Sequence, residues 1–354
     1  MILVDRSKIY IITFNLLFSL LLFSCNSSGL EEFIIEGPTM GTQYKIVIKS
    51  DQDIETNVIL NEVELILDDI NNQMSTYIPD SYISNFNKAK LKGWGSRDSI
   101  LIPNHFLNVI EKSFYYFELS NGVFDITIQP LYDLWGFQDK NLLNDEPSKE
   151  DIQKILTHTG MNKLEFNQVR EKIWSNYPSL SLDVSALAKG YAVDLISEYF
   201  EDRKLFDYFI DIGGEIRVSS TGGKSWDIGI QEPDLNKLGE VNKVIRLSNN
   251  SIATSGNYAN FIEYIDSGVT RTHIINPKTG YPLEIKDGVI SSASVITPLC
   301  MDADALATTL MLLDKDEGLK LIESLDNTEA YLIYYKSGKL HTVESLGFRQ
   351  YLYE

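Results

Sequence analysis

The stretch that decides the fold class runs from Phe206 to Ser219 and reads Phe-Asp-Tyr-Phe-Ile-Asp-Ile-Gly-Gly-Glu-Ile-Arg-Val-Ser. Its two apolar runs, 206–212 and 216–219, are rich in β-branched and aromatic residues, and a glycine pair lies between them. This pattern predicts two strands joined by a tight turn. Further strands are predicted at 226–230, 244–247, 330–335 and 340–343. Strands that follow one another in hairpin-like runs indicate an α+β fold with mixed or antiparallel sheets.

Helices are interspersed among these strands. Strands at 34–36 and 44–49, around a turn at 37–42, precede a helix predicted over 55–73. Other helices are expected at 103–119, from Pro147 onward, at 185–200 after a strand at 180–182, and at 303–313 and 315–324. No Gly-x-Gly-x-x-Gly motif follows the first strand, which disfavours a doubly wound nucleotide-binding domain. We expect one continuous body over residues 33–354, whose halves could form two lobes with a ligand cleft between them.

The N-terminus predicts the compartment. Arg6 and Lys8 precede an apolar stretch, 9–23, that is shorter than the roughly 20 residues of a membrane-spanning helix and has the length of a signal peptide. A small residue before Cys25 resembles the end of a bacterial lipoprotein signal. We therefore predict a signal peptide over 1–24, a lipidated Cys25 and a tether over 25–32. An uncut signal anchor is the alternative, and both place the remaining chain extracytoplasmically, on the periplasmic side, tethered to a membrane.

Charge and cysteine content exclude some partners and sites. The formal net charge of −19 argues against nucleic acid and against electrostatic binding to anionic lipid, so membrane attachment is left to the leader and its lipid. Cys300 is the only cysteine besides Cys25, which rules out an internal disulfide in the processed chain and a zinc framework. Cys300 lies in an apolar run and is expected to be buried.

Asp304 and Thr308 are the first candidate site residues. They belong to Ala-Asp-Ala-Leu-Ala-Thr-Thr-Leu, residues 303–310, an otherwise apolar run of helix formers. Side chains four residues apart project from one face of a helix, so a carboxylate and a hydroxyl would lie side by side in an apolar wall. Hard cations such as Mg²⁺ prefer oxygen ligands of this kind. A solvated Asp and a Thr bonded to its own helix would produce the same pattern.

Several further clusters follow one another along the chain. They are Thr39-Met40-Gly41-Thr42, Met74-Ser75-Thr76-Tyr77, Phe124-Asp125, the run Asp183–Tyr191, Gly213-Gly214-Glu215, His273–Gly280 and Ala303–Thr308. Singly, each could be a turn with solvated polar residues. Together, in this order, they resemble the ApbE family, the FAD:protein FMN transferases. The resemblance extends from Thr39 to about Leu313, and a lipoprotein leader is also common in that family.

The resemblance implies an activity and its partners. Such enzymes use FAD as substrate with Mg²⁺, cleave its pyrophosphate, release AMP and attach FMN to a Ser or Thr hydroxyl of a target protein. The acceptor is an extracytoplasmic redox protein. Phosphoryl transfer depends mostly on positioning and on stabilising charge, which a metal bound to the phosphates supplies.

The resemblance also assigns roles to single residues. Asp304 and Thr308 match metal ligands, and Ala186 matches a position that binds the metal through its backbone carbonyl. The positions that match FAD contacts are Met40, Tyr77, Val123, Phe124, Asp125, Asp183, Lys189 and Ile275. A lysine at the start of a helix suits phosphate, since the helix N-terminus adds amide donors. A flexible thioether and an aromatic ring suit a flat ligand.

His273 is the candidate general base, because deprotonating a Ser or Thr hydroxyl near neutral pH is chemistry that histidine performs. A structural histidine at a strand end is the competing interpretation. The family usually has Asp where this chain has Asn276, so a role for that position in orienting His273 is open.

Two other functions remain open from the sequence. A FAD pyrophosphatase that yields FMN and AMP would use the same metal site, with water in place of a protein hydroxyl. A non-enzymatic, ligand-binding surface lipoprotein would explain the leader and the 19 Tyr, 16 Phe and 4 Trp, but it would not explain the ordered clusters.

Overall fold

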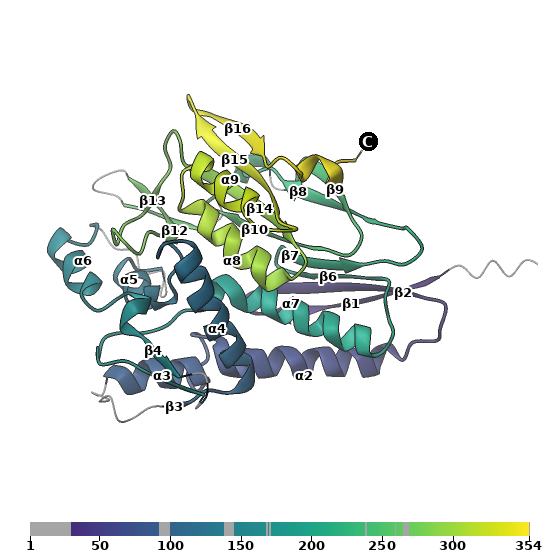
Figure 1. Ribbon diagram of the computed structural model, residues 1–354, viewed down its shortest axis with the longest axis horizontal. Helices are drawn as coiled ribbons and strands as arrows, with labels where there is room; N and C mark the ends of the chain where they lie inside the picture. The colour runs from purple at the N-terminus through teal and green to yellow at the C-terminus, as the bar shows by residue number, and fades with distance from the viewer. Residues whose placement is uncertain are drawn as a thin grey trace, which may run out of the picture.

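The computed structural model describes residues 30–91, 100–137, 145–167, 169, 171–237, 239–258, 260–264 and 269–353. The predicted signal peptide, Cys25 and most of the tether lie outside these residues. Within them, one eight-stranded sheet organises the fold, in the order β1-β2-β6-β7-β10-β14-β15-β16, and every pair in it is antiparallel (Figure 1). Its strands are β1 (Glu31–Thr39), β2 (Thr42–Ser50), β6 (Tyr208–Ile212), β7 (Glu215–Ser219), β10 (Ser251–Gly256), β14 (Ile290–Thr297), β15 (Glu329–Lys336) and β16 (Lys339–Glu344).

Helices cover one face of this sheet, and a strand pair covers the other. Along β15, Ala330 and Leu332 belong to the cluster that contains the helices, whereas Tyr331 and Ile333 belong to the cluster on the opposite face. This alternation follows from the two-residue period of a strand. The helices are α2 (Thr56–Met74), α3 (Tyr82–Leu91), α4 (Asn104–Leu119), α5 (Gln129–Leu134), α6 (Lys149–Leu156), α7 (Ser185–Asp202), α8 (Cys300–Met311) and α9 (Lys315–Glu323). The covering pair is β8 (Trp226–Gln231) with β9 (Val241–Leu247).

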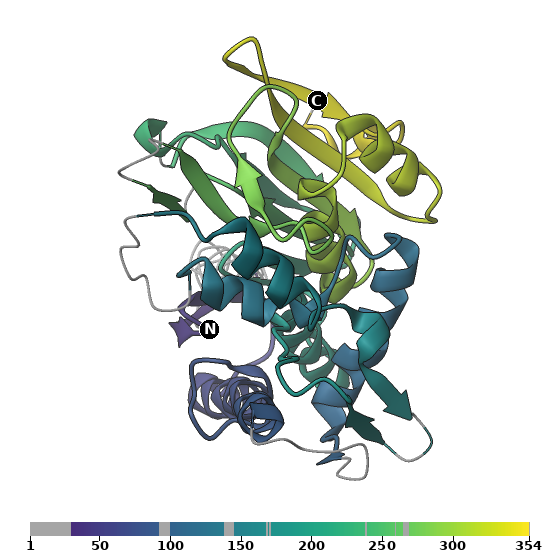
Figure 2. The same cartoon turned by 90° about the vertical axis from the view of Figure 1, so that its left-hand side faces the viewer.

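A third apolar cluster lies around Trp135, where α5 and α6 pack with a small sheet. That sheet consists of β11 (Phe261–Glu263), β12 (Thr270–Ile275) and β13 (Pro282–Glu284). Figure 2 looks onto this end of the molecule and shows α2 nearly along its axis. A last small sheet joins β3 (Ile100–Leu101), β5 (Lys172–Trp174) and β4 (Glu165–Asn167). The predicted α+β class with antiparallel sheets and interspersed helices is confirmed.

The tips of two tight hairpins lie at the same end of the strands of the large sheet. Met40-Gly41 connects β1 to β2, and Gly213-Gly214 connects β6 to β7, with a positive φ at all four residues. Such two-residue connections need positive φ because the turn must match the twist of its strands. β2 pairs with β6, and the Gly213 N–H donates to the Gln43 carbonyl at 3.2 Å, so the two tips are neighbours.

Several local predictions were wrong. Residues 180–182 are not a strand, because the side-chain amide of Asn87 occupies both backbone groups of Leu182, at 2.8 and 2.9 Å. Glu31 and Glu32, expected in the tether, belong to β1. β14 was not predicted at all. Among the described residues, no helix has the length and apolarity that a membrane crossing requires. Cys300 is buried, as expected.

Candidate active site

The twelve candidate residues named from the sequence, apart from Cys25, all line one cavity of about 490 Å³, hereafter the site cavity. They are Met40, Tyr77, Val123, Phe124, Asp125, Asp183, Ala186, Lys189, His273, Ile275, Asp304 and Thr308. Glu215, Tyr132, Ser255 and Tyr258 line it as well. The first group comes from segments that span more than 260 residues of sequence, so the tertiary fold alone brings them together.

Hairpin geometry places Met40. It is the first turn residue between β1 and β2 and has φ of 49°, a left-handed conformation that non-glycine residues rarely adopt. Gly41 follows with φ of 75°. Strained positions of this kind persist where the surrounding structure holds them, and they gather at ligand sites. Met40 therefore lines the cavity from the tip of this hairpin.

The metal candidates lie on α7 and α8. Asp304, only 2% exposed, accepts a hydrogen bond at Oδ2 from the Gly190 N–H at 3.1 Å. Thr308, one turn further along α8, has its Oγ1 3.2 Å from the Ser255 Oγ of β10. Ala186 lies in the first turn of α7. The predicted shared face of Asp304 and Thr308 is thus turned toward the cavity rather than toward solvent.

Asp194 fixes the start of α8. Its carboxylate accepts hydrogen bonds from the backbone N–H groups of Cys300 and Met301, at 2.8 and 2.9 Å, and forms an ion pair with Arg217 at 2.9 Å. It therefore caps a helix that has no side-chain cap of its own. Burial raises the pKa of Asp194 to about 6, although the hydrogen bonds and Arg217 oppose this shift. No local sequence pattern predicts this role, because Asp194 lies more than 100 residues before α8.

Lys189 connects two buried carboxylates. Its Nζ lies 2.6 Å from Glu215 Oε1 and 4.0 Å from Asp304 Oδ1. Burial lowers the pKa of Lys189, but the charges of Asp304 and Glu215 outweigh burial, so the net shift is upward and the ammonium stays charged. Burial also raises the pKa of Glu215 and of Asp304 against the attraction of Lys189. The Gly213-Gly214-Glu215 motif by itself predicts no role for Glu215.

His273 is oriented by a backbone carbonyl. Its Nδ1 lies 3.0 Å from the Asn260 carbonyl oxygen, which can only accept, so Nδ1 carries the proton and Nε2 holds the lone pair. Burial lowers the pKa of His273, the Asn260 carbonyl raises it, and the charge of Lys189 lowers it further, with a net decrease. Asn276 instead accepts hydrogen bonds from the Lys278 and Thr279 N–H groups. Asn276 thus shapes its own turn, and Asn260 supplies the contact that orients the ring.

Two of the predicted FAD contacts are already bonded within the protein. Asp125 accepts from the N–H and hydroxyl of Thr127, at 2.8 and 2.6 Å, and from the Met161 N–H. Asp183 accepts from the Ser185 N–H at 2.8 Å, at the start of α7. Burial raises the pKa of both carboxyls, and these hydrogen bonds partly offset it. Tyr77, by contrast, is 68% exposed at the cavity mouth, where its ring is open to a ligand.

The sequence model of the ApbE family matches residues 40–332, most of the chain.

The chain belongs to the ApbE family.

Curated relatives of this chain include FAD:protein FMN transferases from several bacteria. The FAD:protein FMN transferase of Vibrio cholerae is 33% identical over 311 residues, which cover 86% of this chain and 89% of that protein. The FAD:protein FMN transferase of Haemophilus influenzae is 32% identical over 322 residues, covering 89% and 90%. Relatives of this chain are therefore transferase enzymes, and the family predicted from the motifs is confirmed.

Solved ApbE structures share the fold. The flavin transferase ApbE from Vibrio cholerae matches with a TM-score of 0.78 and 29% identity, over 91% of this chain and 100% of that one. The apo form of the flavinyl transferase ApbE from Pseudomonas stutzeri matches with a TM-score of 0.79 and 28% identity, over 92% and 98%. The large sheet and its helices are thus a family architecture.

The donor set of the ApbE site suits Mg²⁺. The described residues contain no cluster of three or more His, Cys, Asp or Glu that could enclose a metal. The cavity wall instead offers the buried carboxylate of Asp304, the hydroxyl of Thr308 and the backbone carbonyl of Ala186. All three are hard oxygen donors. Mg²⁺ commonly binds through one or two carboxylates and completes its shell with water and substrate phosphates. Oε2 of Glu215 is buried with no hydrogen-bond partner among the described residues, which leaves a further oxygen at this wall.

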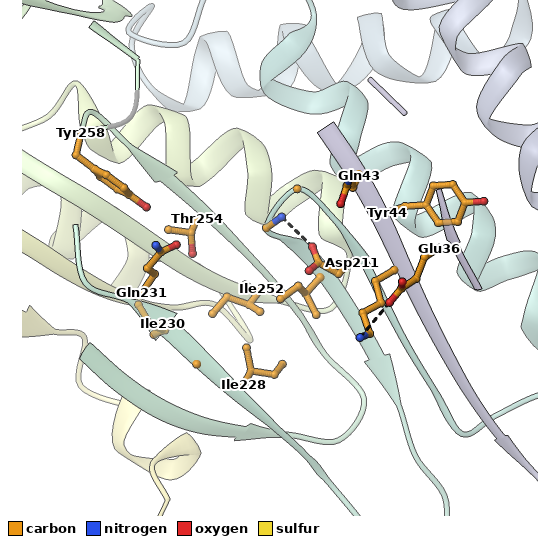
Figure 3. A pocket seen from close by; sticks show the side chains of 15 residues that line it. Glu36, Gln43, Tyr44, Asp211, Ile228, Ile230, Gln231, Ile252, Thr254 and Tyr258 are labelled. Atoms are coloured by element: carbon orange, nitrogen blue, oxygen red, sulfur yellow. Dashed lines mark hydrogen bonds and ion pairs between the residues drawn. The ribbon is translucent and has the colours of Figure 1, made fainter. Parts of the chain in front are cut away.

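A second cavity of about 510 Å³ adjoins the first and shares Gly213, Thr254 and Tyr258 with it. Figure 3 shows this adjoining cavity, with Ile228 and Ile230 of β8 on one side and Asp211 on the other. Asp211 accepts from the Gly214 N–H at 2.8 Å and so braces the β6–β7 turn. Gly213 thus lines both cavities, whereas Asp211 lines only the adjoining cavity and Glu215 only the site cavity.

Proposed function

We propose that this chain catalyses the Mg²⁺-dependent transfer of FMN from FAD to a Ser or Thr hydroxyl of a protein, with release of AMP. The observation that carries the proposal is the Lys189–Glu215–Asp304 cluster on the wall of a cavity lined by every residue that the family motifs predict. Membership of the ApbE family and the names of its relatives support the flavin substrate.

The proposed chemistry balances as a single phosphoryl transfer. The acceptor hydroxyl oxygen forms a bond to the FMN phosphorus, the bond from this phosphorus to the bridging oxygen breaks, and AMP leaves with that oxygen. His273 takes the hydroxyl proton on Nε2, which is free because Nδ1 donates to Asn260. Lys189 holds the phosphates by charge, as a flexible ammonium does well. Met40 and Tyr77 contact the flat rings of the substrate.

A cation would be held by Asp304, Thr308 and the Ala186 carbonyl. When bound, it would neutralise charge that develops on the phosphate oxygens. The remaining work belongs to the chain itself, because positioning contributes much of the acceleration of phosphoryl transfer. The cap of Asp194 on α8 and the contact of Gly190 with Asp304 provide that positioning.

The direct test incubates the purified full chain with FAD, Mg²⁺ and candidate acceptor proteins from the extracytoplasmic side of the membrane. Covalent flavin is read by in-gel fluorescence, and AMP by chromatography. Transfer predicts one fluorescent acceptor band and one AMP per flavin attached, both lost with a chelator. Free FMN with AMP and no labelled protein would instead identify a FAD pyrophosphatase. FAD binding with neither product would identify a binding lipoprotein.

A further inference from the structure

Glu215 is more buried than a residue that only pairs with a lysine needs to be, and one of its carboxylate oxygens has no partner among the described residues. It begins β7 directly after the Gly213-Gly214 turn, is only 3% exposed and lines the site cavity. One carboxylate oxygen, Oε1, lies 2.6 Å from Lys189 Nζ. The other, Oε2, is buried with no hydrogen-bond partner among the described residues. Anchoring Lys189 needs one oxygen only, so the buried second oxygen remains to be explained, because leaving such an atom unpaired is unfavourable.

The two buried carboxylates on this wall of the cavity share a single lysine as their counterion among the described residues. Asp304 and Glu215 are both buried, and Lys189 is the cation that the structure places beside each of them. With both ionised, two carboxylates that share one ammonium would carry a net negative charge in a region of low dielectric, where a lone charge is costly. A divalent cation would compensate this negative charge. Lys189 Nζ, 2.6 Å from Glu215 and 4.0 Å from Asp304, marks the space between the two carboxylates.

We infer that Glu215 is a second carboxylate of the cation site, facing Asp304, and that Lys189 is a resident counterion which the cation displaces from between the two. The inference rests on the cation requirement of the proposed function. Lys189 has a flexible stem and is 27% exposed, so it can turn toward the cavity once a cation takes its place. The exchange ties release of the phosphate-binding lysine to arrival of the metal.

The test uses Mn²⁺ as the probe and the purified full chain without FAD, with free Mn²⁺ measured by electron paramagnetic resonance. Glu215→Gln keeps the size of the side chain and an acceptor oxygen for Lys189. It should weaken Mn²⁺ binding about 10- to 100-fold, the usual range for loss of a group that supports a metal site. Asp211→Asn is the matched control, since it removes the same charge from the same hairpin but faces the adjoining cavity and keeps an acceptor for Gly214. Its Mn²⁺ affinity should match that of the wild type.

Displacement of Lys189 by the cation can be tested separately, through the Mn²⁺ affinity of a Lys189 variant. Lys189→Gln removes the competitor, so it should tighten Mn²⁺ binding in the absence of FAD. Unchanged Mn²⁺ affinity in Glu215→Gln, or an equal loss in Asp211→Asn, would overturn the role of Glu215. Weaker binding in Lys189→Gln would overturn the displacement.

A direct measurement covers the case in which Glu215→Gln does not fold. Anomalous diffraction from wild-type crystals soaked in Mn²⁺ alone should place the ion in contact with oxygens of both Glu215 and Asp304. An ion on Asp304 but out of reach of Glu215 would refute the inference. None of these measurements depends on turnover, so loss of this inference would leave FMN transfer standing, and failure of FMN transfer would leave the Mn²⁺ result intact.

Discussion

The backbone N–H of Gly190 donates a hydrogen bond to Oδ2 of Asp304 at 3.1 Å, and this contact joins α7 to α8 beside the site cavity. The approach is possible because residue 190 has no Cβ. A Cβ there would lie 2.5 Å from the Cys300 carbonyl oxygen and 2.7 Å from the Met301 Cα, which are backbone atoms that cannot rotate away. The position of Asp304 thus depends on a glycine in the neighbouring helix.

Gly190→Ala should therefore force the two helices apart. Overpacking of a well-packed core typically costs about 1–3 kcal/mol, and we expect a loss of this size in the free energy of unfolding, measured by chemical denaturation. FMN transfer should fall as well, because Asp304 moves. Glu198→Ala on the exposed side of α7 is the control and should change stability by less than about 0.5 kcal/mol. A Gly190→Ala protein as stable and active as the wild type would show that the helices are not held by this contact.

Asp304→Ala should abolish FMN transfer while the chain stays folded, because the substitution removes the one carboxylate among the three predicted metal ligands. FAD binding, measured by quenching of flavin fluorescence, should persist, since Met40 and Tyr77 contact the rings without the metal. Asp302→Asn on the same helix is the control; Asp302 pairs with Lys112 at 2.7 Å and does not line the cavity. Full Mg²⁺-dependent activity in Asp304→Ala would disprove the metal assignment.

His273→Ala should reduce transfer about 10²- to 10⁴-fold, the usual cost of losing a general base, with little change in FAD affinity. The pKa of His273 is lowered, so its neutral, base-competent form predominates at pH 7. The acid limb of kcat/KM in the wild type should accordingly lie below the usual histidine value of 6.5. The variant should lack that limb and recover partly at high pH. Equal losses of binding and transfer, without recovery, would mean that His273 holds the ligand or the fold instead.

Asp194 should make stability depend on pH. Its folded pKa of about 6 lies above the ordinary value of 3.8, so the folded state binds the proton more tightly than the unfolded state does. This contribution is fully present below about pH 3.8 and is lost as pH rises through 6. Asp194→Asn does not titrate. The stability of the wild type relative to Asp194→Asn should therefore increase as pH falls from 7 to 5, in paired denaturation curves. A difference that is constant with pH would contradict this.

Cys25 should be the first residue of the mature protein and should carry lipid. The basic, apolar and small-residue order that ends at Cys25 motivates this prediction. Mass spectrometry of the native N-terminus checks it, and Cys25→Ser should leave the leader uncleaved. An unmodified Met1, or cleavage elsewhere, would remove the lipid anchor and leave the extracytoplasmic location to be tested separately.

Local patterns accounted for many of the elements. Apolar runs on either side of Gly213-Gly214 predicted β6 and β7, apolar periodicity predicted α2, and helices predicted at 185–200 and 303–313 correspond to α7 and α8. β14 escaped because its sequence, Ile-Ser-Ser-Ala-Ser-Val-Ile-Thr, lacks the alternation of a half-buried strand. It is buried at every position, and neighbours such as Thr254, 2.8 Å from Ser294, satisfy its hydroxyls. A serine looks the same in a sequence whether its partner is water or another strand.

The sequence by itself determined the family, the order of the motifs and the identity of twelve residues that line one cavity. These depend on residue type and on spacing along the chain, both of which can be read directly from the amino-acid sequence. Only the tertiary structure decided which groups act on those residues: Asp194 on the start of α8, Asn260 on His273, and Glu215 on Lys189. Each of these contacts joins segments that are distant in sequence or uses a backbone carbonyl, so no local periodicity encodes it. Hydrogen bonds and charges act over a few ångström of space, and only the folded chain sets those distances.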